Sequence, residues 1–311
     1  LKPQAFHETP ITRSGGIAAI ISLSIFFYIY HLLYAEVLYN YIFISLSVFT
    51  IGFLDDLRIN IKPLSRLIIM ILLLFACIYM LPIKILNVDI PFLTSLMSSP
   101  MFSSIFVLLC FLFVINGANL IDGFNGLLTI NLIIINIILT YININNGNLE
   151  FSILIISQII ILLSFLLFNF PSAKIFLGDS GAYTMGALNG LNAIITNNLN
   201  PTISSFFFCT LLFYLFFEVF FSFLRKLLLR KSPIYPDDKH LHMLSYYKIS
   251  GIYGKNKGNY LNSIIINFFY LILIMPGLYL MLDAQLSRYW FFILLLIYLI
   301  IYSRLYSFTK N

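Results

Sequence analysis

Long apolar runs separated by short polar segments dominate the chain. Each run long enough to cross about 30 Å of hydrocarbon is interpreted as a helix, and the shorter runs need a thin bilayer or a tilted fit. Ten spans are predicted, near residues 15–35, 37–54, 67–82, 101–118, 127–143, 150–168, 182–197, 202–224, 261–281 and 289–306. The pattern therefore predicts an all-α fold, a polytopic membrane helical bundle that forms one domain over residues 1–311.

The composition excludes an ordinary soluble domain. Of the 311 residues, 60% are apolar and only 10% are charged, and the mean hydropathy is +0.97. The three cysteines, Cys77, Cys110 and Cys209, all lie in apolar runs, so neither a disulfide framework nor a thiolate metal site is expected. The expected environment is a lipid bilayer, and no nucleic-acid partner is expected.

The basic residues predict how the chain is oriented. Ten spans place both termini on one side, and that side receives 16 of the 18 Lys and Arg residues, while Lys84 and Arg288 fall opposite. Basic residues favour the cytoplasmic side of a membrane. Most acids, and both histidines of the longest polar loop, fall on the same side. This convergence predicts an active site at the cytoplasmic face.

A polar stretch, residues 116–126, ends the apolar run 101–115. Asn116, Asn119, Asp122 and Asn125 recur every three residues, so on an α-helix neighbouring members point within about 60° of each other and can line one wall of a cavity. Such groups cost several kcal/mol in a membrane segment unless they meet water, a cation or each other. The alternative interpretation is a helix cap and turn built on the glycines of this stretch.

Two adjacent carboxylates, Asp55 and Asp56, lie at the cytoplasmic end of the second predicted span. Adjacent carboxylates repel each other unless a cation lies nearby or one of them is protonated. Mg²⁺ prefers one or two carboxylates together with water and phosphate oxygens, so the pair suits magnesium-dependent phosphoryl chemistry. A charged anchor at the membrane interface is the alternative.

In two polar turns, glycines lie next to a charged residue that could take part in binding or catalysis. Arg13 is followed by Ser14-Gly15-Gly16, whose backbone N–H groups can approach a phosphate. Asp179 lies between glycines and can project into a site, and Phe176 just before it can stack on a base. Plain turns are the alternative in both places.

Two further groups concern the region after residue 200. Glu218 lies inside a predicted span, and Arg225 follows two turns later on the same face, which suits either a structural ion pair or a catalytic role. His240 and His242 can bind phosphate, bind a transition metal or relay protons. A zinc site is the weakest of these options, because no Cys or third His lies nearby. Solvated, inert histidines are the alternative.

In this order the motifs resemble those of the polyprenyl-phosphate N-acetylhexosamine-1-phosphate transferases, glycosyltransferase family 4. The resemblance runs from about Arg13 to His242, roughly three quarters of the chain. Its most specific parts are the Asp55-Asp56 pair, the Asn-Gly-Ala-Asn-Leu-Ile-Asp-Gly stretch, the Phe-Leu-Gly-Asp-Ser-Gly turn, and the segment from Ser232-Pro to His-Leu-His. The last segment is similar to the branch that starts O-antigen, common-antigen and teichoic-acid synthesis, and more distantly to the lipid I synthase.

The resemblance implies a membrane enzyme of bacterial cell-surface polysaccharide synthesis. In the family reaction a lipid phosphate attacks the β-phosphate of a UDP-sugar, which gives a polyprenyl-diphospho-sugar and UMP. The implied substrates are undecaprenyl phosphate and the UDP derivative of GlcNAc or a related acetamido sugar, and the implied cofactor is Mg²⁺, with Mn²⁺ as an alternative. The implied location is the bacterial cytoplasmic membrane, and a homodimer is one possible assembly.

The resemblance also implies residue roles. Asn119 and Asp179 are expected to hold the metal. Catalytic roles are expected for Asp55, Asp56, His240 and His242, with the two aspartates handling the lipid phosphate and the diphosphate. Substrate contacts are expected at Arg13, Asn116, Asp122, Asn169 and Phe176, the last three of them with the uridine.

The chain departs from the family pattern in four places. Asn125 stands where many members have a second Asp, Glu218 where many have Asp, and Met243 where many have another His. Members usually carry one more span before the Arg13 region, so an additional N-terminal helix is expected to precede this sequence. These differences leave the identity of the sugar open.

Two non-enzymatic hypotheses stand beside the transferase. A transporter or lipid flippase would carry acids near the bilayer midplane of several spans, whereas here only Glu218 lies inside one. A purely structural membrane protein would not need carboxylates converging from three separate loops.

Overall fold

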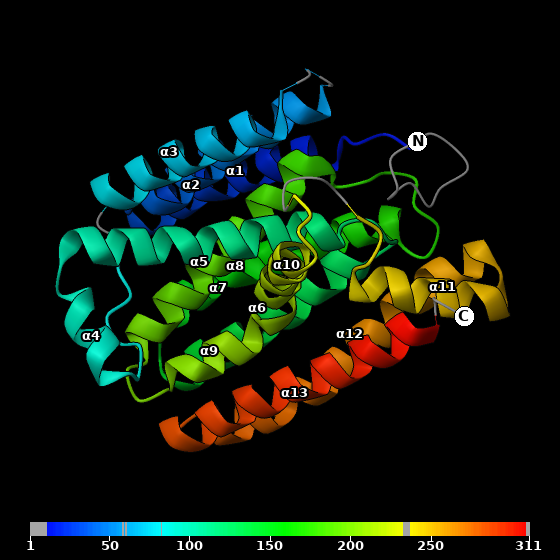
Figure 1. The fold of residues 1–311 in the computed structure, drawn as a ribbon. Helices are drawn as coiled ribbons and strands as arrows, with labels where there is room; N and C mark the ends of the chain where they lie inside the picture. The colour runs from blue at the N-terminus through cyan, green and yellow to red at the C-terminus, as the bar shows by residue number, and fades with distance from the viewer. Residues whose placement is uncertain (1–10, 58, 60, 82, 233–236, 309–311) are drawn as a thin grey trace.

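A computed structural model describes residues 11–308 of the protein apart from 58, 60, 82 and 233–236. Over these residues the chain forms thirteen helices and no strand, which confirms the all-α prediction. A single parallel bridge joins Thr12 to Ile175. Figure 1 shows long helices stacked side by side with most of their turns at the two ends of the bundle.

The helices differ widely in length. They are α1 (Gly15–Tyr34), α2 (Tyr39–Asp56), α3 (Pro63–Met80), α4 (Pro91–Met97), α5 (Pro100–Ile121), α6 (Leu127–Asn145), α7 (Leu149–Asn169), α8 (Gly178–Leu199), α9 (Ser205–Leu211), α10 (Phe213–Leu228), α11 (Leu241–Tyr253), α12 (Lys255–Leu280) and α13 (Ala284–Phe308).

Seven of the helices in the described part of the chain are long and apolar enough to cross a membrane, namely α1, α3, α5, α6, α7, α12 and α13. An eighth span results if α9 and α10, which meet at a bend of 77°, are counted together. The chain is thus a multi-pass membrane protein, but the predicted count of ten is too high by this measure. The other two predicted segments form α2, which ends in an Asp pair, and α8, which is rich in Gly and Asn.

Helix α8 lies at the centre of the bundle, which explains its polar composition. It contacts α1, α2, α5 and α6, and nearly all of its residues are buried in the protein. A helix surrounded by other helices meets little lipid, so small and amide-bearing residues can form its interfaces. Asn192 illustrates this arrangement: it accepts a hydrogen bond from the Tyr41 hydroxyl (2.7 Å) and donates to Gln158 (2.8 Å) and Asn136 (3.1 Å).

Glycine lets α2 approach the beginning of α8 closely. A Cβ placed on Gly52 would lie 2.5 Å from the backbone of Ser180, which is too close for any side chain. This contact lies one turn before Asp55 and Asp56 and brings the end of α2 directly onto the first turn of α8.

Hydrogen bonds fix the beginning of the last helix, α13, at the end of the bundle that lies opposite the contact between α2 and the start of α8. The Arg288 guanidinium donates to the Asp89 carbonyl (2.7 Å), and the Asp89 carboxylate accepts from the Ser204 hydroxyl just before α9 (2.7 Å). One end of α13 is therefore fixed against α9, while its other end reaches α11.

Candidate active site

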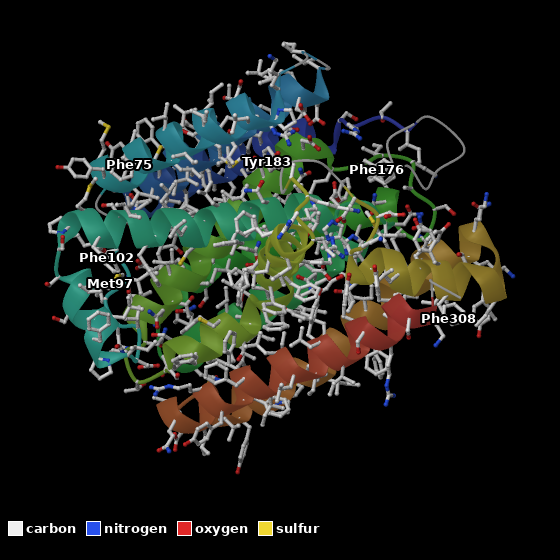
Figure 2. All side chains as sticks on the ribbon, in the orientation of Figure 1. Phe75, Met97, Phe102, Phe176, Tyr183 and Phe308 are labelled. Carbon is white, nitrogen blue, oxygen red and sulfur yellow. The ribbon has the colours of Figure 1, made fainter. Side chains whose placement is uncertain are left out.

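Most of the predicted site residues meet at one end of the bundle, where α2 and α5 end and α8 begins. Figure 2 shows Phe176 and Tyr183 toward this end and Met97 and Phe102 toward the opposite end. Two groups of charged side chains lie here. The first, called the carboxylate cluster below, consists of Arg13, Asp55, Asp56, Arg66, Asp122 and Asp179.

Asp56 caps the first turn of α8. Its carboxylate accepts hydrogen bonds from the backbone N–H groups of Asp179 (3.0 Å) and Ser180 (2.9 Å) and from the Ser180 hydroxyl (2.7 Å). A carboxylate at a helix N-terminus satisfies unpaired N–H donors and is favoured by the helix dipole. Gly178 has a φ of 76°, and a Cβ there would meet the Asp56 carboxylate at 2.7 Å. Asp56 thus holds the turn that presents Asp179.

Two arginines lie on either side of Asp179. Arg13 approaches one oxygen of Asp179 at 3.7 Å and one oxygen of Asp56 at 3.9 Å. Arg66 bonds Asp55 at 2.8 Å and approaches the other oxygen of Asp179 at 3.4 Å. The Arg13 side chain is 47% exposed, so its guanidinium can also meet a ligand from solution.

The carboxylate cluster holds more negative charge than its arginines neutralise. Burial raises the pKa of Asp179 to about 7, and the hydrogen bond with Asp55 and the charges of Asp55 and Asp56 add to this rise, against the opposing effect of Arg13. Burial, followed by the charge of Asp179, also raises the pKa of Asp122 well above its ordinary value. A bound cation would favour the ionised form of both groups.

The donor groups of this cluster fit a magnesium ion that is shared with a substrate. Within the described residues, no three His, Cys, Asp or Glu side chains are grouped so as to hold a metal by themselves. Mg²⁺ usually takes only one or two carboxylates and completes its shell with water and phosphate oxygens. Asp179 and Asp55, whose carboxylates interact directly, supply such a pair. Both residues are candidates to hold the ion, alongside the predicted ligand Asn119.

Asn119, the other predicted metal ligand, lies slightly deeper in the bundle. Its amide donates to the Tyr183 hydroxyl at 3.3 Å, and Tyr183 follows Asp179 by one helical turn. The Arg66 guanidinium lies over the Tyr183 ring, 5.9 Å from its centre. Asn119 is therefore close to the carboxylate cluster, and its role as a metal ligand stays a prediction.

The polar stretch 116–126 does not form one helical wall. Helix α5 ends at Ile121, so Asp122 is its C-cap and Asn125 lies in the following turn. Gly126, with a φ of 76°, continues that turn. Asn116 and Asn119 lie on α5 as expected, but the expectation that Asp122 and Asn125 continue the same helix was wrong, because the chain turns after Ile121. The cap-and-turn alternative holds for these two residues.

Three of the predicted substrate-binding residues also bond within the protein. Asn116 donates to the Leu112 carbonyl one turn earlier (2.7 Å). Asn169 accepts from the Gly126 N–H (2.7 Å) and donates to the Ile175 carbonyl (2.9 Å), which fixes two turns together. The backbone N–H of Phe176 donates to the Thr12 carbonyl (2.9 Å). Substrate contacts of these three residues stay predictions.

The second group of charged side chains, called the histidine cluster below, lies where α10, α11 and α13 meet. It consists of Glu218, Arg225, Asp237, His240, His242, Tyr298 and Tyr302. Residues 233–236 of the predicted Ser-Pro motif lie outside the described part of the chain.

Glu218 is 1% exposed, and its partners differ from those expected. It accepts from the Tyr298 hydroxyl (2.9 Å) and the Leu241 N–H (3.1 Å), and it contacts His240 (3.3 Å). Arg225 instead forms a two-oxygen ion pair with Asp237 (2.8 and 3.0 Å). Of the two interpretations of Glu218 and Arg225, the ion pair was wrong, because the chain after α10 brings Asp237 to Arg225 and His240 to Glu218. The catalytic role stays a prediction.

Both histidines are buried, so the alternative of solvated histidines was wrong. His240 lies between two carboxylates, with Nδ1 at 3.3 Å from Glu218 and Nε2 at 3.3 Å from Asp237. Nδ1 of His242 lies 3.4 Å from the Tyr214 hydroxyl, and burial lowers the pKa of His242 to about 3. The two rings lie parallel, with centroids 5.5 Å apart.

The turn after α5 links the two clusters. The Phe124 ring packs edge-on against His242 at a centroid distance of 5.7 Å and contacts Tyr246 at 5.1 Å. The N–H of Asn125 donates to the Asn259 side chain (2.8 Å). Asp122, which comes just before this turn, belongs to the carboxylate cluster, so the turn lies between the two clusters.

Sequence reasoning missed Arg66, Tyr183, Tyr298 and Tyr302. Arg66 counted only as one more basic residue near the membrane, although it lies 11 residues after Asp55 and 2.8 Å from it. Tyr298 and Tyr302 lie in an apolar helix and Tyr183 in the Gly- and Asn-rich α8, and in neither does the sequence indicate which hydroxyl meets a charge.

Comparisons with known proteins match the part of the chain that carries most of the carboxylate cluster. The family model described as Glycosyl transferase family 4 matches residues 38–197, about half of the chain. The matched range contains the whole carboxylate cluster except Arg13, and the histidine cluster lies beyond it.

Several bacterial relatives are similar to this chain. The undecaprenyl-phosphate alpha-N-acetylglucosaminyl 1-phosphate transferase of Thermotoga maritima is 26% identical over 245 residues, which cover 78% of this chain and 70% of that protein. The phospho-N-acetylmuramoyl-pentapeptide-transferase of Clostridium perfringens is 33% identical over 153 residues, 47% of this chain and 48% of the relative. That of Streptococcus thermophilus is 33% identical over 184 residues, 55% and 53% of the two chains. The matches span only about half the length of these last two relatives.

Proposed function

Because this chain belongs to glycosyl transferase family 4, we propose that it transfers an N-acetylhexosamine 1-phosphate group from a UDP-sugar to undecaprenyl phosphate. The products are an undecaprenyl-diphospho-sugar and UMP. The relative from Thermotoga maritima, which covers most of this chain, acts on undecaprenyl phosphate with N-acetylglucosamine 1-phosphate, as its name states. UDP-GlcNAc is accordingly the first donor to test.

The observation that carries the proposal is the presentation of Asp179. Asp56 holds it in the first turn of α8, and Arg13 and Arg66 lie against its two oxygens. Transfer between two phosphorylated substrates depends more on positioning and charge neutralisation than on covalent chemistry. Carboxylates that hold a cation, together with a half-exposed arginine, would both position the phosphates and neutralise their charge.

The reaction needs no strong general base. The phosphate of the lipid acceptor is an anion at neutral pH, with a second pKa near 6 as in other phosphate monoesters. Its oxygen forms a bond to the β-phosphorus of the donor, and the bond from that phosphorus to the bridging oxygen of UMP breaks. A bound Mg²⁺ supplies charge neutralisation of the diphosphate. In this proposal the half-exposed Arg13 binds the phosphates, and Asp56 keeps Asp179 in position.

The proposal is tested by a transfer assay with the purified full chain in lipid nanodiscs. Undecaprenyl phosphate, Mg²⁺ and radiolabelled UDP-GlcNAc, UDP-GalNAc or UDP-glucose are supplied in parallel. We expect label in the lipid fraction and release of UMP with an acetamido sugar and not with UDP-glucose. A folded protein that transfers label from none of the three donors would refute the proposal.

A further inference from the structure

The last helix, α13, contributes two tyrosines to the histidine cluster, Tyr298 and Tyr302, whose hydroxyl groups bond its other members. We propose that Tyr298 and Tyr302 are positioning residues, which hold the segment Asp237–His242, the loop that leads into α11 together with the first residues of that helix, in the arrangement that the transfer reaction needs. The inference rests on the proposed function and extends it to a helix outside the family match, which ends at residue 197.

Tyr298 acts through Glu218. Its hydroxyl donates to Oε1 of Glu218 at 2.9 Å, and the same oxygen accepts the N–H of Leu241 at the start of α11 (3.1 Å). The second oxygen of Glu218 contacts His240 at 3.3 Å. A buried carboxylate needs several donors to offset the loss of water. The Tyr298 hydroxyl is therefore part of what holds Glu218 where it can orient His240.

Tyr302, one turn further along α13, acts on the other side of the loop. Its hydroxyl donates to the Lys239 carbonyl (3.1 Å) and contacts the Arg225 guanidinium. Arg225 in turn holds both oxygens of Asp237, which contacts the second ring nitrogen of His240 at 3.3 Å. Each nitrogen of His240 is thus held by a carboxylate that a tyrosine of α13 helps to orient.

Helix α13 is itself held in place at its other end, so it can position the loop. The opposite end of α13 is tied to Asp89 by Arg288 (2.7 Å), so the two tyrosines do not depend on the loop for their position. The loop continues into His242, whose ring contacts Phe124 in the turn that follows Asp122. Both ring nitrogens of His240 face protein carboxylates, which favours a role in setting the loop over direct contact with substrate.

The first experiment removes single hydroxyl groups. Tyr298→Phe keeps a ring that packs against Phe217 and Phe221 (centroid distances 4.9 and 5.4 Å), so the helix packing is preserved. We expect kcat for transfer from UDP-GlcNAc to fall about tenfold, with KM for the donor changed by less than about twofold, because the loss affects the arrangement of reacting groups and not donor binding. The matched control is Tyr41→Phe, which removes a buried hydroxyl bonded to Asn192 (2.7 Å) far from the loop and should leave kcat unchanged.

The second experiment asks whether Tyr298 acts through Glu218. In a Glu218→Gln background, Tyr298→Phe should have almost no further effect on kcat, whereas two independent losses would multiply. Thermal unfolding of every variant is recorded, and Tyr302→Phe provides a second test if Tyr298→Phe unfolds.

The inference is overturned if Tyr298→Phe or a folded Tyr302→Phe keeps wild-type kcat, or if the losses of Tyr298→Phe and Glu218→Gln multiply. The inference is also overturned if kcat falls equally in Tyr298→Phe and in the control Tyr41→Phe and both variants unfold at a lower temperature, because the loss would then reflect general destabilisation. Wild-type protein that transfers no sugar would instead refute the proposed function, so the two failures are distinguishable.

Discussion

At the scale of single residues, the carboxylate cluster separates two aspartates that look alike in the sequence. Asp56 accepts three hydrogen bonds from the first turn of α8. Asp55, its neighbour, pairs with Arg66 (2.8 Å) and interacts with Asp179. The adjacent carboxylates therefore avoid mutual repulsion by facing different partners. Asp56 shapes the site, while Asp55 and Asp179 remain the candidates for holding a cation.

Replacing Asp179 should separate metal binding from folding. Its pKa is raised to about 7, so at pH 8 its charge opposes folding when no cation is present. We expect Asp179→Asn to lower kcat at least about a hundredfold, the scale of losing one positioned electrostatic group, yet to raise the unfolding temperature in EDTA.

Differential scanning fluorimetry with and without Mg²⁺ checks the prediction on Asp179. Mg²⁺ should stabilise the wild type and leave the Asp179→Asn variant unchanged. If the variant kept near-normal turnover with the same dependence on Mg²⁺, the metal would have to lie elsewhere.

The lowered pKa of the buried His242 predicts that the folded protein loses stability in mild acid. Its pKa is about 3 in the folded protein against an ordinary value of 6.5, so below pH 6.5 the unfolded chain binds a proton that the folded protein excludes. The stability that this group provides is complete above pH 6.5 and decreases toward pH 3, by up to about 1.4 kcal/mol per pH unit.

The comparison with His242→Gln isolates this effect from other titrating groups. Between pH 7.5 and 5.5 the unfolding temperature of the wild type should fall further than that of the variant. Parallel curves for the two proteins would contradict the prediction.

At the scale of helices, the apolar pattern located every long element but not its detailed shape. Each of the ten predicted segments is helical, yet the segment 202–224 is broken at Leu212 into α9 and α10 by a bend of 77°. No Gly or Pro lies between Ser205 and Leu228. The break is stabilised from elsewhere in the chain, because the Tyr270 hydroxyl donates to the Leu211 carbonyl. A tertiary hydrogen bond of this kind cannot be predicted from local sequence.

The candidate site shows the same division between what the sequence indicates and what it does not. Asp56 and Asp179 were recognisable because charged residues beside apolar runs are rare and their motifs resemble a known family. The sequence did not identify Arg66, Tyr298 and Tyr302, because their roles follow from contacts with residues 11 to 80 positions away in the chain. The ion-pair interpretation of Glu218 and Arg225 failed for the same reason, since helical spacing indicates neighbours on one helix but not competing partners from another part of the chain.

The contact between α2 and α8 should be intolerant of any side chain at Gly52. A methyl group there would meet the Ser180 backbone at 2.5 Å and push Asp56 away from the turn that it caps. We expect Gly52→Ala to lower the unfolding free energy by about 1–3 kcal/mol, as overpacking does, and to lower kcat about tenfold or more. Gly251→Ala is the matched control, because nothing lies within 4 Å of a Cβ at that helical position. Equal behaviour of the two variants would show that the close approach has no role.

At the scale of the whole molecule, the bundle places its charged chemistry at one end. The beginning of α1 and the end of α13 both lie at the end that holds the two clusters (Figure 1). This agrees with the expectation that the first predicted span begins, and the last one ends, on the same side, even though fewer than ten of the described helices are long and apolar enough to cross a membrane. Helices α2 and α8 are less apolar but also run along the bundle, and their polar residues are covered by neighbouring helices.

The orientation of the bundle is the last prediction, and it follows from this arrangement of charge. Basic residues concentrate in the segment from Arg225 to Tyr260, next to the histidine cluster, and loops rich in Lys and Arg remain on the cytoplasmic side. We therefore expect the end of the bundle that holds both clusters to face the cytoplasm. Asn256 is exposed near the start of α12, and Asn145 is exposed at the end of α6, on the opposite side of the bundle.

A single cysteine is introduced at either position in a variant whose three native cysteines are replaced by serine. A membrane-impermeant thiol reagent applied to intact cells should label Asn145→Cys and should label Asn256→Cys only after the membrane is permeabilised. The reverse pattern would place both clusters outside the cell, where UDP-sugars are absent. It would then contradict the proposed donor as well as the orientation, because a transferase that uses a cytoplasmic nucleotide sugar must open its site to the compartment that supplies it.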